Sequence, residues 1–424
     1  MFDLINKIFY NYNYKGNQLS SFKELQKNIA IKNLFRVIEN YSENSEIRYV
    51  GGCVRKILNH EKVEDIDLAV NLTPLEVINV LKKNDIKFYE TGIEHGTITV
   101  NINQNKFEVT SLRKDILTDG RHAKVKFTTD WHEDALRRDF SINSIYADIN
   151  GDLFDPFDGK KDLENGEIKF IGDSEKRIKE DYLRVLRYVR FFLNYSKKNH
   201  DIKVIKIIKQ NLEGISKISS ERLLDEFKKL TKSDGFRKLF NDKESLERIE
   251  IIFPQLKILN SFKKQNSYTY NNLFKVDFIF LLSLMIVDET DNADYFMYKF
   301  NISKKDQKRL KLIDFFYKKN VNIKNFTEKN FNKIFYFNGR QAVIDIINFK
   351  LFKSNKLEKN LIKLIEVYKD KIKPTMPIGA NVLMSKYNIP EGKILGNKLK
   401  MIEEIWVENS FQISDKQIQK IIKS

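Results

Sequence analysis

The sequence contains few of the residues that cross-link or interrupt a chain. Its single cysteine, Cys53, excludes an internal disulfide, and six prolines in 424 residues leave room for long helices. The longest apolar stretch, Phe278 to Val287, has ten residues, whereas a membrane-spanning helix needs about 20. We therefore expect a buried core helix there and no membrane span. Because Met1 to Tyr10 carries Asp3 and no signal-type cleavage site, we also expect a cytoplasmic protein.

Acidic residues are outnumbered by basic ones. Lys and Arg total 75 against 58 Asp and Glu, which makes the net charge +17. Such a surplus favours a polyanionic partner such as nucleic acid, bound in a way that weakens steeply as salt rises. The same surplus can follow from a general enrichment in Lys, Asn and Ile, so charge alone does not establish an RNA partner. No feature of the sequence indicates an oligomeric state.

Length and hydrophobic periodicity predict two or more structural units. Strands are expected at residues 48–50, 66–70, 97–100 and 106–110, the last two as a hairpin, with a helix at 74–83. Beyond about Lys176 the pattern is helical, with stretches at 175–192, 221–230, 277–287, 357–368 and 397–406. The predicted fold class is α+β, a small mixed-sheet head followed by helices.

Two aspartates lie at the start of the second expected strand. Asp65 and Asp67 are two residues apart, and on a strand this spacing points both side chains to one face. Glu108 lies on the neighbouring hairpin between apolar residues. Hard oxygen ligands of this kind suit Mg²⁺, and three can hold two ions about 3.5–4 Å apart, one activating an attacking hydroxyl and one neutralising pyrophosphate. An isolated Asp-x-Asp is also common on exposed strands and loops that bind nothing.

A glycine pair stands just upstream of these acids. Gly51 and Gly52 follow the first expected strand, and Val54 to Leu58 behind them is compatible with a helix. Glycines let backbone N–H groups approach a triphosphate, a helix N-terminus attracts negative charge, and Arg55 can clamp phosphate. A lone Gly-Gly is usually a turn, whereas Gly-Gly-x-x-Arg ahead of Asp-x-Asp is a far more specific pattern.

Five blocks, in this order, resemble the family of class II tRNA nucleotidyltransferases and bacterial poly(A) polymerases, among the polymerase-beta-like nucleotidyltransferases. The first, Val50 to Leu58 with Asp65 to Asp67, resembles the metal and triphosphate motif. Residues 137–144, 155–163, 180–191 and 221–228 resemble in turn the ribose and phosphate block, the hinge element, the base-selecting helix and the element that buttresses it. The chain departs from the family at Lys56, usually an acid, and at Ser144, usually alanine.

The resemblance implies a nucleotidyltransferase head with a mixed sheet at 25–158, a helical neck at 159–262, and a helical body and tail at 263–424 that bind tRNA. It implies Mg²⁺-dependent, template-independent addition of CMP, CMP and AMP to the tRNA 3′ end from CTP and ATP, with release of pyrophosphate. The expected catalytic residues and metal ligands are Asp65, Asp67 and Glu108. The expected nucleotide-binding residues are Gly51, Gly52, Arg55, Arg138, Asp139, Asn143, Glu180, Asp181, Arg184, Arg187 and Arg190.

The helix expected at 175–192 can select bases by its charges. At about 100° per residue, Glu180, Asp181, Arg184 and Arg187 fall on one arc and apolar residues on the other, with Arg190 at the edge. An ionised aspartate only accepts hydrogen bonds and an arginine only donates them. Cytosine and adenine present an amine beside an unprotonated ring nitrogen, which this pair matches, whereas guanine and uracil present the reverse. The alternative is a helix with ordinary surface ion pairs.

Several related activities share these blocks. Enzymes that add only CC lack a flexible loop before the second block, whereas this chain retains Arg113 to Phe127, including Asp119-Gly120-Arg121. Against a poly(A) polymerase, residues 376–379 and 390–396 and Trp406 resemble the tail of tRNA-type enzymes, with glycine-opened helix starts that cradle phosphates or simply turn the chain. A poly(A) polymerase, a partial CC- or A-adding enzyme, and a non-enzymatic RNA-binding protein remain the alternatives.

Overall fold

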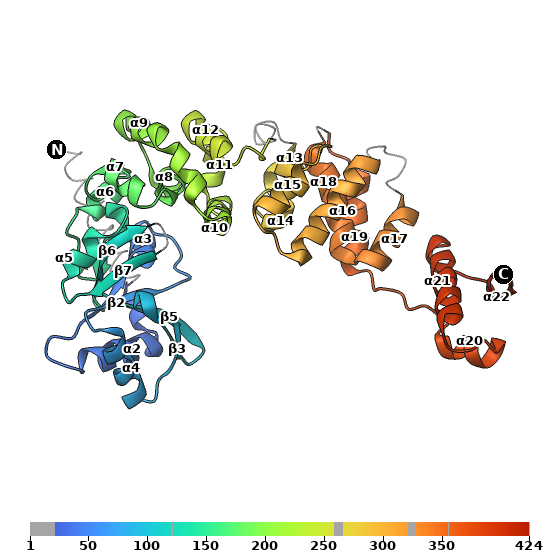
Figure 1. The fold of residues 1–424 in the computed structure, drawn as a ribbon, viewed down its shortest axis with the longest axis horizontal. Coiled ribbons are helices and arrows are strands. Elements are labelled where there is room, and N and C mark those ends of the chain that lie inside the picture. The colour runs from blue at the N-terminus through green and yellow to red at the C-terminus, as the bar shows by residue number, and fades with distance from the viewer. Residues whose placement is uncertain (1–21, 120–121, 258–265, 321–326, 355, 424) are drawn as a thin grey trace, which may run out of the picture. The chain divides into compact units, whose positions relative to one another are not determined.

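The structure is a computed structural model that describes residues 22–119, 122–257, 266–320, 327–354 and 356–423. The chain forms two compact units, residues 1–248 and 249–424. Unit 1 carries the sheets, and unit 2 is helical in the part of the chain that the structure describes (Figure 1). The predicted α+β fold, a mixed-sheet head followed by helices, is confirmed.

A seven-stranded sheet forms the head, in the order β3-β4-β5-β2-β1-β8-β9. Only β2 and β5 run parallel among its paired strands, so the sheet is mixed as predicted. The expected strands and the β4–β5 hairpin are confirmed, although β2 begins later than expected. The strands are β1 Ile47–Val50, β2 Asp67–Val70, β3 Lys87–Gly92, β4 Thr97–Ile102, β5 Asn105–Ser111, β8 Tyr146–Ala147 and β9 Leu153–Phe154.

Helix α4 (Pro74–Lys83) confirms the helix expected at 74–83, and its start has a local cause. The Thr73 hydroxyl accepts from the Glu76 N–H, the Glu76 carboxylate accepts from the Thr73 N–H, and Pro74 occupies the first turn. Helix α2 (Ile29–Glu39) packs against both α4 and β1. These contacts place α2 against the central part of the sheet, at β1.

The segment that the resemblance predicts to be a flexible loop forms a second, two-stranded sheet. Strand β6 (Arg113–Asp119) pairs antiparallel with β7 (His122–Phe127), from Arg113 opposite Phe127 to Asp119 opposite His122. The segment that the resemblance predicts to be retained is therefore present as a hairpin whose backbone groups pair with one another, and its flexibility stays a prediction. Gly120 and Arg121 lie outside the described residues.

The helix expected at 175–192 is two helices. Helix α7 (Ser174–Glu180) ends where Asp181 adopts an extended backbone, with φ −154° and ψ 102°, and α8 (Leu183–Tyr195) begins two residues later. The Asp181 carboxylate accepts from the Leu183 N–H at 3.2 Å. A side chain that satisfies the first turn of a new helix competes with continuation of the old one. The prediction of one continuous helix is therefore wrong.

Helix α8 packs on α7, α10 and α11. The helix expected at 221–230 is confirmed as α10. Further helices of unit 1 are α5 Trp131–Leu136, α6 Gly159–Asn165, α9 Ile202–Gln210, α10 Ser220–Thr231, α11 Gly235–Leu239 and α12 Lys243–Ile252, the last of which crosses the boundary between the units.

Unit 2 contains the three other predicted helices, as α14, α19 and α21. Residues 280–286 of α14 are all buried, which confirms the expected core helix. Gly379 and Gly392 cap the starts of α20 and α21, as the sequence predicts for the C-terminal region. The helices are α13 Ser267–Asn272, α14 Phe278–Ile286, α15 Asn292–Lys299, α16 Lys304–Asn320, α17 Glu328–Asn338, α18 Arg340–Lys353, α19 Lys359–Asp370, α20 Ala380–Tyr387, α21 Lys393–Glu408 and α22 Asp415–Lys423.

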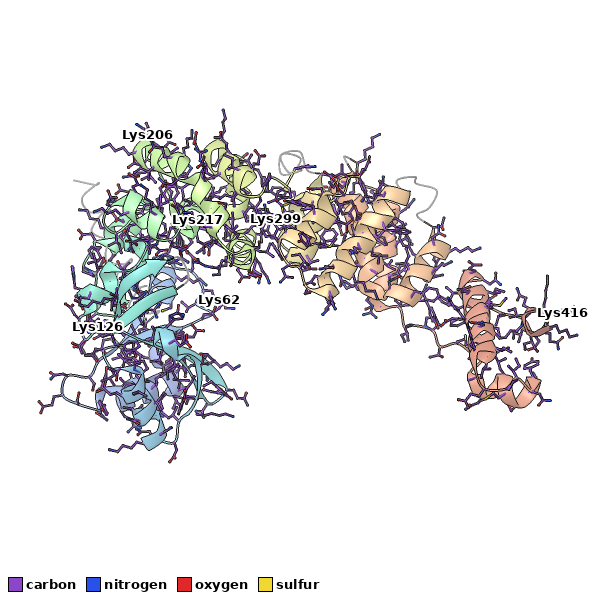
Figure 2. All side chains as sticks on the ribbon, in the orientation of Figure 1. Lys62, Lys126, Lys206, Lys217, Lys299 and Lys416 are labelled. Carbon is purple, nitrogen blue, oxygen red and sulfur yellow. The ribbon has the colours of Figure 1, made fainter. Side chains whose placement is uncertain are left out.

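Lysines stand on the surface of both units. Exposed examples are labelled in Figure 2, from Lys62 and Lys126 in the head to Lys299 and Lys416 in unit 2. The net charge of +17 is thus carried by side chains that a polyanion can reach. No helix among the described residues is long and apolar enough to cross a membrane.

Candidate active site

A cavity of about 990 Å³ in unit 1 brings the head sheet together with α3 (Gly52–Leu58), α8 and α10. All residues that the sequence predicts for the site line this cavity, including those separated by more than a hundred positions. They are Gly51, Gly52, Arg55, Asp65, Asp67, Glu108, Arg138, Asp139, Asn143, Glu180, Asp181, Arg184, Arg187 and Arg190. Their roles stay predictions, but their placement in one cavity is a property of the fold.

The carboxylates enter the cavity from neighbouring parallel strands. Asp67 is the first residue of β2 and stands opposite Glu108 of β5 in the parallel register. Asp65 lies in an exposed bend before β2. The prediction that Asp65 and Asp67 share one strand face is wrong, because the pairing with β5 begins only at Asp67.

Asp67 lies close to two other carboxylates, so negative charge accumulates around it. Burial raises its pKa, and the nearby charges of Glu108 and Asp65 raise it further, against the opposing charges of Arg138 and Arg55. A group of like charges in a partly buried position favours binding of a cation. A cation at these strand ends would relieve the repulsion among the carboxylates, which is the property that the predicted metal site requires.

The donor chemistry fits Mg²⁺, although the ligand set is incomplete on the protein side. Among the described residues no three His, Cys, Asp or Glu side chains form a group that could hold a metal ion by themselves. Mg²⁺ is usually held by one or two carboxylates together with water and substrate phosphates rather than by an all-protein cage. Asp67 and Glu108 supply that kind of partial set.

The turn after β1 brings the backbone close to Asp67. Gly51 has φ +66°, a conformation that favours glycine, and its N–H donates to the Ile145 carbonyl at 3.2 Å. A Cβ added at Gly52 would lie 3.8 Å from Asp67 Oδ2. The predicted strand, glycine turn and helix are confirmed. Helix α3 has only seven residues, so the close backbone approach matters more here than a helix dipole.

Arg55 is held inside the cavity wall. Its Nη1 donates to Asn143 Oδ1, and its guanidinium carbon lies 4.8 Å from the Phe191 ring centroid and 5.0 Å from that of Tyr195. Its buried Nε has no hydrogen-bond partner among the described residues. A buried donor without a partner is costly, and an anionic ligand would satisfy it.

Arg138 is oriented by a buried carboxylate that the sequence analysis did not single out. Its Nη2 donates to Asp134 Oδ2 at 3.0 Å, and the Tyr146 hydroxyl donates to the same oxygen at 2.7 Å. Burial opposes ionisation of Asp134, but Arg138 and Arg137 lower its pKa well below the usual range. The charge of Arg138 is therefore fixed in place rather than mobile.

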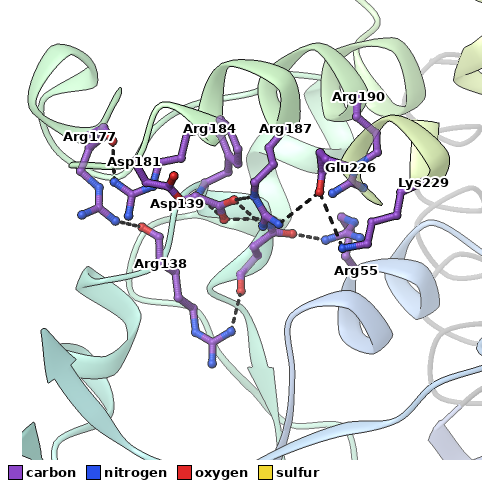
Figure 3. Close-up of polar contacts among 12 residues, drawn as sticks. Arg55, Arg138, Asp139, Arg177, Asp181, Arg184, Arg187, Arg190, Glu226 and Lys229 are labelled. Atoms are coloured by element: carbon purple, nitrogen blue, oxygen red, sulfur yellow. Dashed lines mark hydrogen bonds and ion pairs between the residues drawn. The ribbon is translucent and has the colours of Figure 1, made fainter. Parts of the chain in front are cut away.

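Asp139 links the head to α8. Asn143 Nδ2 donates to its Oδ1 at 2.9 Å, and Arg187 Nε donates to its Oδ2 at 2.6 Å (Figure 3). Burial alone would raise its pKa, but the charge of Arg187 and the hydrogen bond from Asn143 lower it to about 2. Because Asn143 also accepts from Arg55, one chain of hydrogen bonds runs from α3 to α8.

The two expected base-reading residues each have another partner of opposite charge. Arg184 Nη1 donates to Glu180 Oε2 and to the Arg177 carbonyl, both at 2.6 Å. Asp181 Oδ2 accepts from Arg222 Nη2 of α10 at 2.7 Å. The break between α7 and α8 thus places Asp181 beside α10. The prediction that Glu180, Asp181, Arg184 and Arg187 lie on one arc of a continuous helix is therefore wrong.

Helix α10 contributes charged residues both to the cavity lining and to the buried layer behind it. Arg222 lines the cavity, and Glu226 is buried, with its Oε1 accepting from Arg190 Nε and its Oε2 lying 3.9 Å from Arg187 Nη1. Sequence analysis named this segment only as a supporting element. The sequence does contain a signal for Glu226. It falls on the same helix face as the apolar residues Leu223 and Leu230, and an acid on a buried face requires a partner of opposite charge.

The comparisons with known proteins agree with this architecture. Residues 47–169 match the family described as the poly A polymerase head domain, and residues 201–259 match the probable RNA and SrmB-binding site of polymerase A. Over these residues the chain is similar to tRNA nucleotidyltransferases and poly(A) polymerases.

Curated relatives are similar to this chain over part of their length. The mitochondrial CCA tRNA nucleotidyltransferase 1 of Homo sapiens is 45% identical over 191 residues, which is 44% of each chain. The CCA-adding enzyme of Lactobacillus johnsonii is 38% identical over 197 residues, or 46% of this chain and 48% of the relative. The matched region thus spans about half the length of these relatives.

Solved structures share the fold over nearly the whole chain. The CCA-adding enzyme of Bacillus stearothermophilus in complex with CTP superimposes with a TM-score of 0.73 at 20% identity, covering 93% of this chain and 96% of that one. The Thermotoga maritima CCA-adding enzyme complexed with tRNA gives a TM-score of 0.58 at 18% identity, covering 96% and 98%. At these identities the likeness establishes the fold.

Proposed function

We propose that this protein adds CMP, CMP and AMP to the 3′ end of tRNA, from CTP and ATP and without a nucleic-acid template. The observation that carries the proposal is a single cavity that joins paired carboxylates, arginines and an Asp181/Arg184 pair. The relatives named CCA tRNA nucleotidyltransferase and CCA-adding enzyme support it. In this reaction the RNA 3′-hydroxyl attacks the α-phosphorus of the bound triphosphate and pyrophosphate leaves.

Asp67 and Glu108, with Asp65 nearby, would hold Mg²⁺ at the ends of β2 and β5. Bound there, Mg²⁺ would lower the pKa of the attacking hydroxyl and neutralise charge on the leaving pyrophosphate. The carboxylates themselves fix where the hydroxyl and the α-phosphate meet. Loss of Asp67, the more buried of the three, should therefore abolish addition of every nucleotide.

Arginines and glycines would bind the triphosphate. Gly51 and Gly52 bring the backbone close to Asp67, and Arg138 is held rigidly by Asp134. Arg55 retains an unsatisfied Nε in the cavity wall. These groups offer donors to phosphate oxygens without needing to reorganise, which is how a positively charged site favours a transferring phosphate group.

Asp181 and Arg184 would read the base. The carboxylate of Asp181 accepts from the exocyclic amine of cytosine or adenine, and Arg184 donates to the adjacent ring nitrogen. Guanine and uracil would place acceptor against acceptor and donor against donor, at a cost of about 1–3 kcal/mol for each group left unpaired. Two such mismatches, about 2–6 kcal/mol together, account for rejection by about 30-fold to 10⁴-fold at about 1.4 kcal/mol per tenfold. Glu180, Arg187 and Arg190 would hold Arg184 and the cavity wall in place.

We further propose a catalytic head at 25–158, a neck at 159–262, and a body and tail at 263–424 that bind tRNA. The exposed lysines of both units and the glycine-capped starts of α20 and α21 support an RNA partner. We propose the cytoplasm as the compartment, which the single buried cysteine, Cys53, supports. Cell fractionation with a tagged full chain tests this assignment.

The second candidate is a poly(A) polymerase, because the matching head-domain family carries that description. A third is an enzyme that adds only part of CCA. The retained β6–β7 segment favours all three additions, and the glycine-capped tail helices favour a tRNA-type enzyme over a poly(A) polymerase.

Purified full chain with Mg²⁺, labelled CTP or ATP, and three tRNA transcripts distinguishes these activities. The transcripts end before CCA, after the first C, and after CC, and we expect CC then A to be added and synthesis to stop. Poly(A) synthesis on the third transcript would indicate the polymerase, and arrest after CC would indicate the partial enzyme. Asp67→Ala should abolish all additions, whereas Asp152→Ala, which removes an exposed acid outside the cavity lining, should not.

A further inference from the structure

The open face of the head sheet continues outward from the candidate metal site. One row of residues crosses four neighbouring strands, β2, β5, β4 and β3, and consists of Asp67, Glu108, Thr99 and Tyr89. These four residues are partly or fully exposed, whereas their neighbours along β4 and β5 are buried. At about 4.8 Å between strands, the row extends about 14 Å from Asp67. It leaves the cavity after Glu108, because Thr99 and Tyr89 are not part of the lining.

An aromatic ring and two lysines lie at the outer end of this face. Tyr89 is 43% exposed on the edge strand β3, and Lys87 Nζ lies 5.6 Å from the centroid of its ring. Hydrogen bonding to Lys87 and to Asn101 lowers the pKa of the Tyr89 hydroxyl. In the next row Lys87 stands opposite Asn101, and Asn101 opposite the exposed Lys106. We call Lys87, Tyr89, Thr99, Asn101 and Lys106 the outer strip.

The composition of the outer strip suits a single-stranded nucleic acid. Aromatic rings stack on unpaired bases, lysines pair with phosphates, and some RNA-binding sheets use exposed aromatic residues on their strands in this way. In the proposed reaction the RNA 3′-hydroxyl has to reach Asp67 and Glu108, so the nucleotides before it have to leave the cavity nearby. The outer strip begins beside Glu108 and carries the charge that complements their phosphates.

We propose that the outer strip binds the unpaired 3′ strand of the RNA substrate behind its reacting hydroxyl, with Tyr89 stacked on a base and Lys87 and Lys106 beside phosphates. The inference rests on the proposed function, because that function places the 3′-hydroxyl at the carboxylates. Stacking tolerates any base, since every base has a π face. The outer strip therefore contributes affinity for RNA and takes no part in the choice between CTP and ATP.

The role of Tyr89 is tested by steady-state kinetics of the full chain, with the tRNA transcripts and the nucleotides varied separately. We expect Tyr89→Ala to raise the KM for tRNA about tenfold, which corresponds to about 1.4 kcal/mol, and to leave the KM for CTP and ATP unchanged. Tyr89→Phe keeps the ring and should stay close to the wild type. Tyr41→Ala is the matched control, because Tyr41 is 44% exposed in the same unit and lies outside the outer strip and the cavity lining.

The role of the lysines is tested by the salt dependence of tRNA binding, measured by fluorescence anisotropy without nucleotide. Two lost contacts to single-strand phosphates should reduce the slope of log affinity against log salt by about 1.4 in the double variant Lys87→Gln/Lys106→Gln. Lys82→Gln/Lys83→Gln is the control, because it removes two exposed cations from the last turn of α4 and should change the slope far less.

The outcomes separate this inference from the proposed function. An unchanged KM for tRNA in Tyr89→Ala, or an unchanged slope in the double variant of Lys87 and Lys106, would overturn the inference, and the proposed function would stand if Asp67→Ala still abolishes addition. Self-association of that double variant at unchanged RNA affinity would also overturn it, because the lysines would then only protect the edge strand. If the wild type adds no nucleotide, the proposed function fails whatever the binding data show. Urea unfolding verifies that each variant is folded, and the lysine variants decide if Tyr89→Ala is not.

Discussion

Glu226 offers the most direct test of the charge network around the cavity. Its side chain is 2% exposed, Arg190 donates to one of its oxygens, and Arg187 and Lys229 lie 3.9 and 3.7 Å from the other. We expect Glu226→Gln, which preserves the shape and removes the charge, to destabilise unit 1, because a buried guanidinium then loses its counter-charge.

The size of this destabilisation depends on which neighbouring cations keep another carboxylate once Glu226 is neutral. Removing one member of a buried ion pair costs about 3–5 kcal/mol. Arg187 retains Asp139, and Lys229 is 61% exposed, so only Arg190 loses its carboxylate altogether. The lower end, about 3 kcal/mol, therefore applies, and with a urea dependence of about 2 kcal/mol per M it lowers the unfolding midpoint by about 1.5 M.

The two tryptophans allow the units to be followed separately. Trp131 lies in unit 1 and Trp406 in unit 2, both buried, so a Trp406→Phe background leaves Trp131 to report unfolding of unit 1. Asp225→Asn is the matched control, because it removes the same charge from the adjacent, exposed position of α10 and should change stability by less than about 0.5 kcal/mol. A midpoint shift for Glu226→Gln no larger than that of Asp225→Asn would refute the network.

Three further predictions concern pH and packing. The pKa of Asp139 is about 2 in the folded protein, below its value in an unfolded chain. The ionised carboxylate therefore stabilises the fold by about 2 kcal/mol above about pH 4, and this stabilisation is lost as the pH falls toward 2. Asp139→Asn should flatten this part of the plot of unfolding free energy against pH, measured by Trp131 fluorescence, and an unchanged slope would contradict the low pKa. Burial lowers the pKa of Lys353 to about 8. Between about pH 8 and 10.5 the unfolded chain therefore binds more protons than the folded one, and the free energy of unfolding of unit 2 should rise across that window. Lys353→Met should remove this rise and stabilise unit 2 by about 2–3 kcal/mol at pH 7, as measured by Trp406 fluorescence. A Cβ at Gly159 would stand 2.1 Å from the Ser141 carbonyl oxygen, so Gly159→Ala should cost about 3 kcal/mol or more in urea unfolding. Gly172→Ala, with no heavy atom within 4 Å of the added Cβ, should cost only about 1 kcal/mol, which comes from the strain of its φ of +80°.

The parts of the fold that sequence predicts well are those with a strong local signal. Helix α4 has a capping box and a proline at its start, and β4 and β5 alternate apolar and polar residues around a tight connection. The glycine turn before α3 is similarly local, because Gly51 needs a positive φ. In each case a few neighbouring residues determine the conformation, so no knowledge of the rest of the chain is required.

The predictions that fail are those that depend on contacts between distant segments, which the spacing of residues along the chain does not specify. Asp181 has the same helical spacing whether or not the helix continues, and only its hydrogen bond to Leu183 and its partner on α10 decide that it breaks. Asp65 falls outside β2 because strand pairing with β5 starts at Asp67. The partners of Arg222 and Glu226 depend on how α10 packs on α8, which the spacing within either helix does not specify.

The parallel pairing of β2 with β5 has a consequence for the order in which the protein matures. β5 is synthesised after β2, β3 and β4, yet it must insert beside β2 at the centre of the sheet. Pairings between distant segments form late, after the entropy of closing the intervening loop has been overcome. A nascent chain cannot therefore bring Asp67 opposite Glu108 until β5 has left the ribosome, so we expect ribosome-stalled chains in which β5 has not emerged to add no nucleotide.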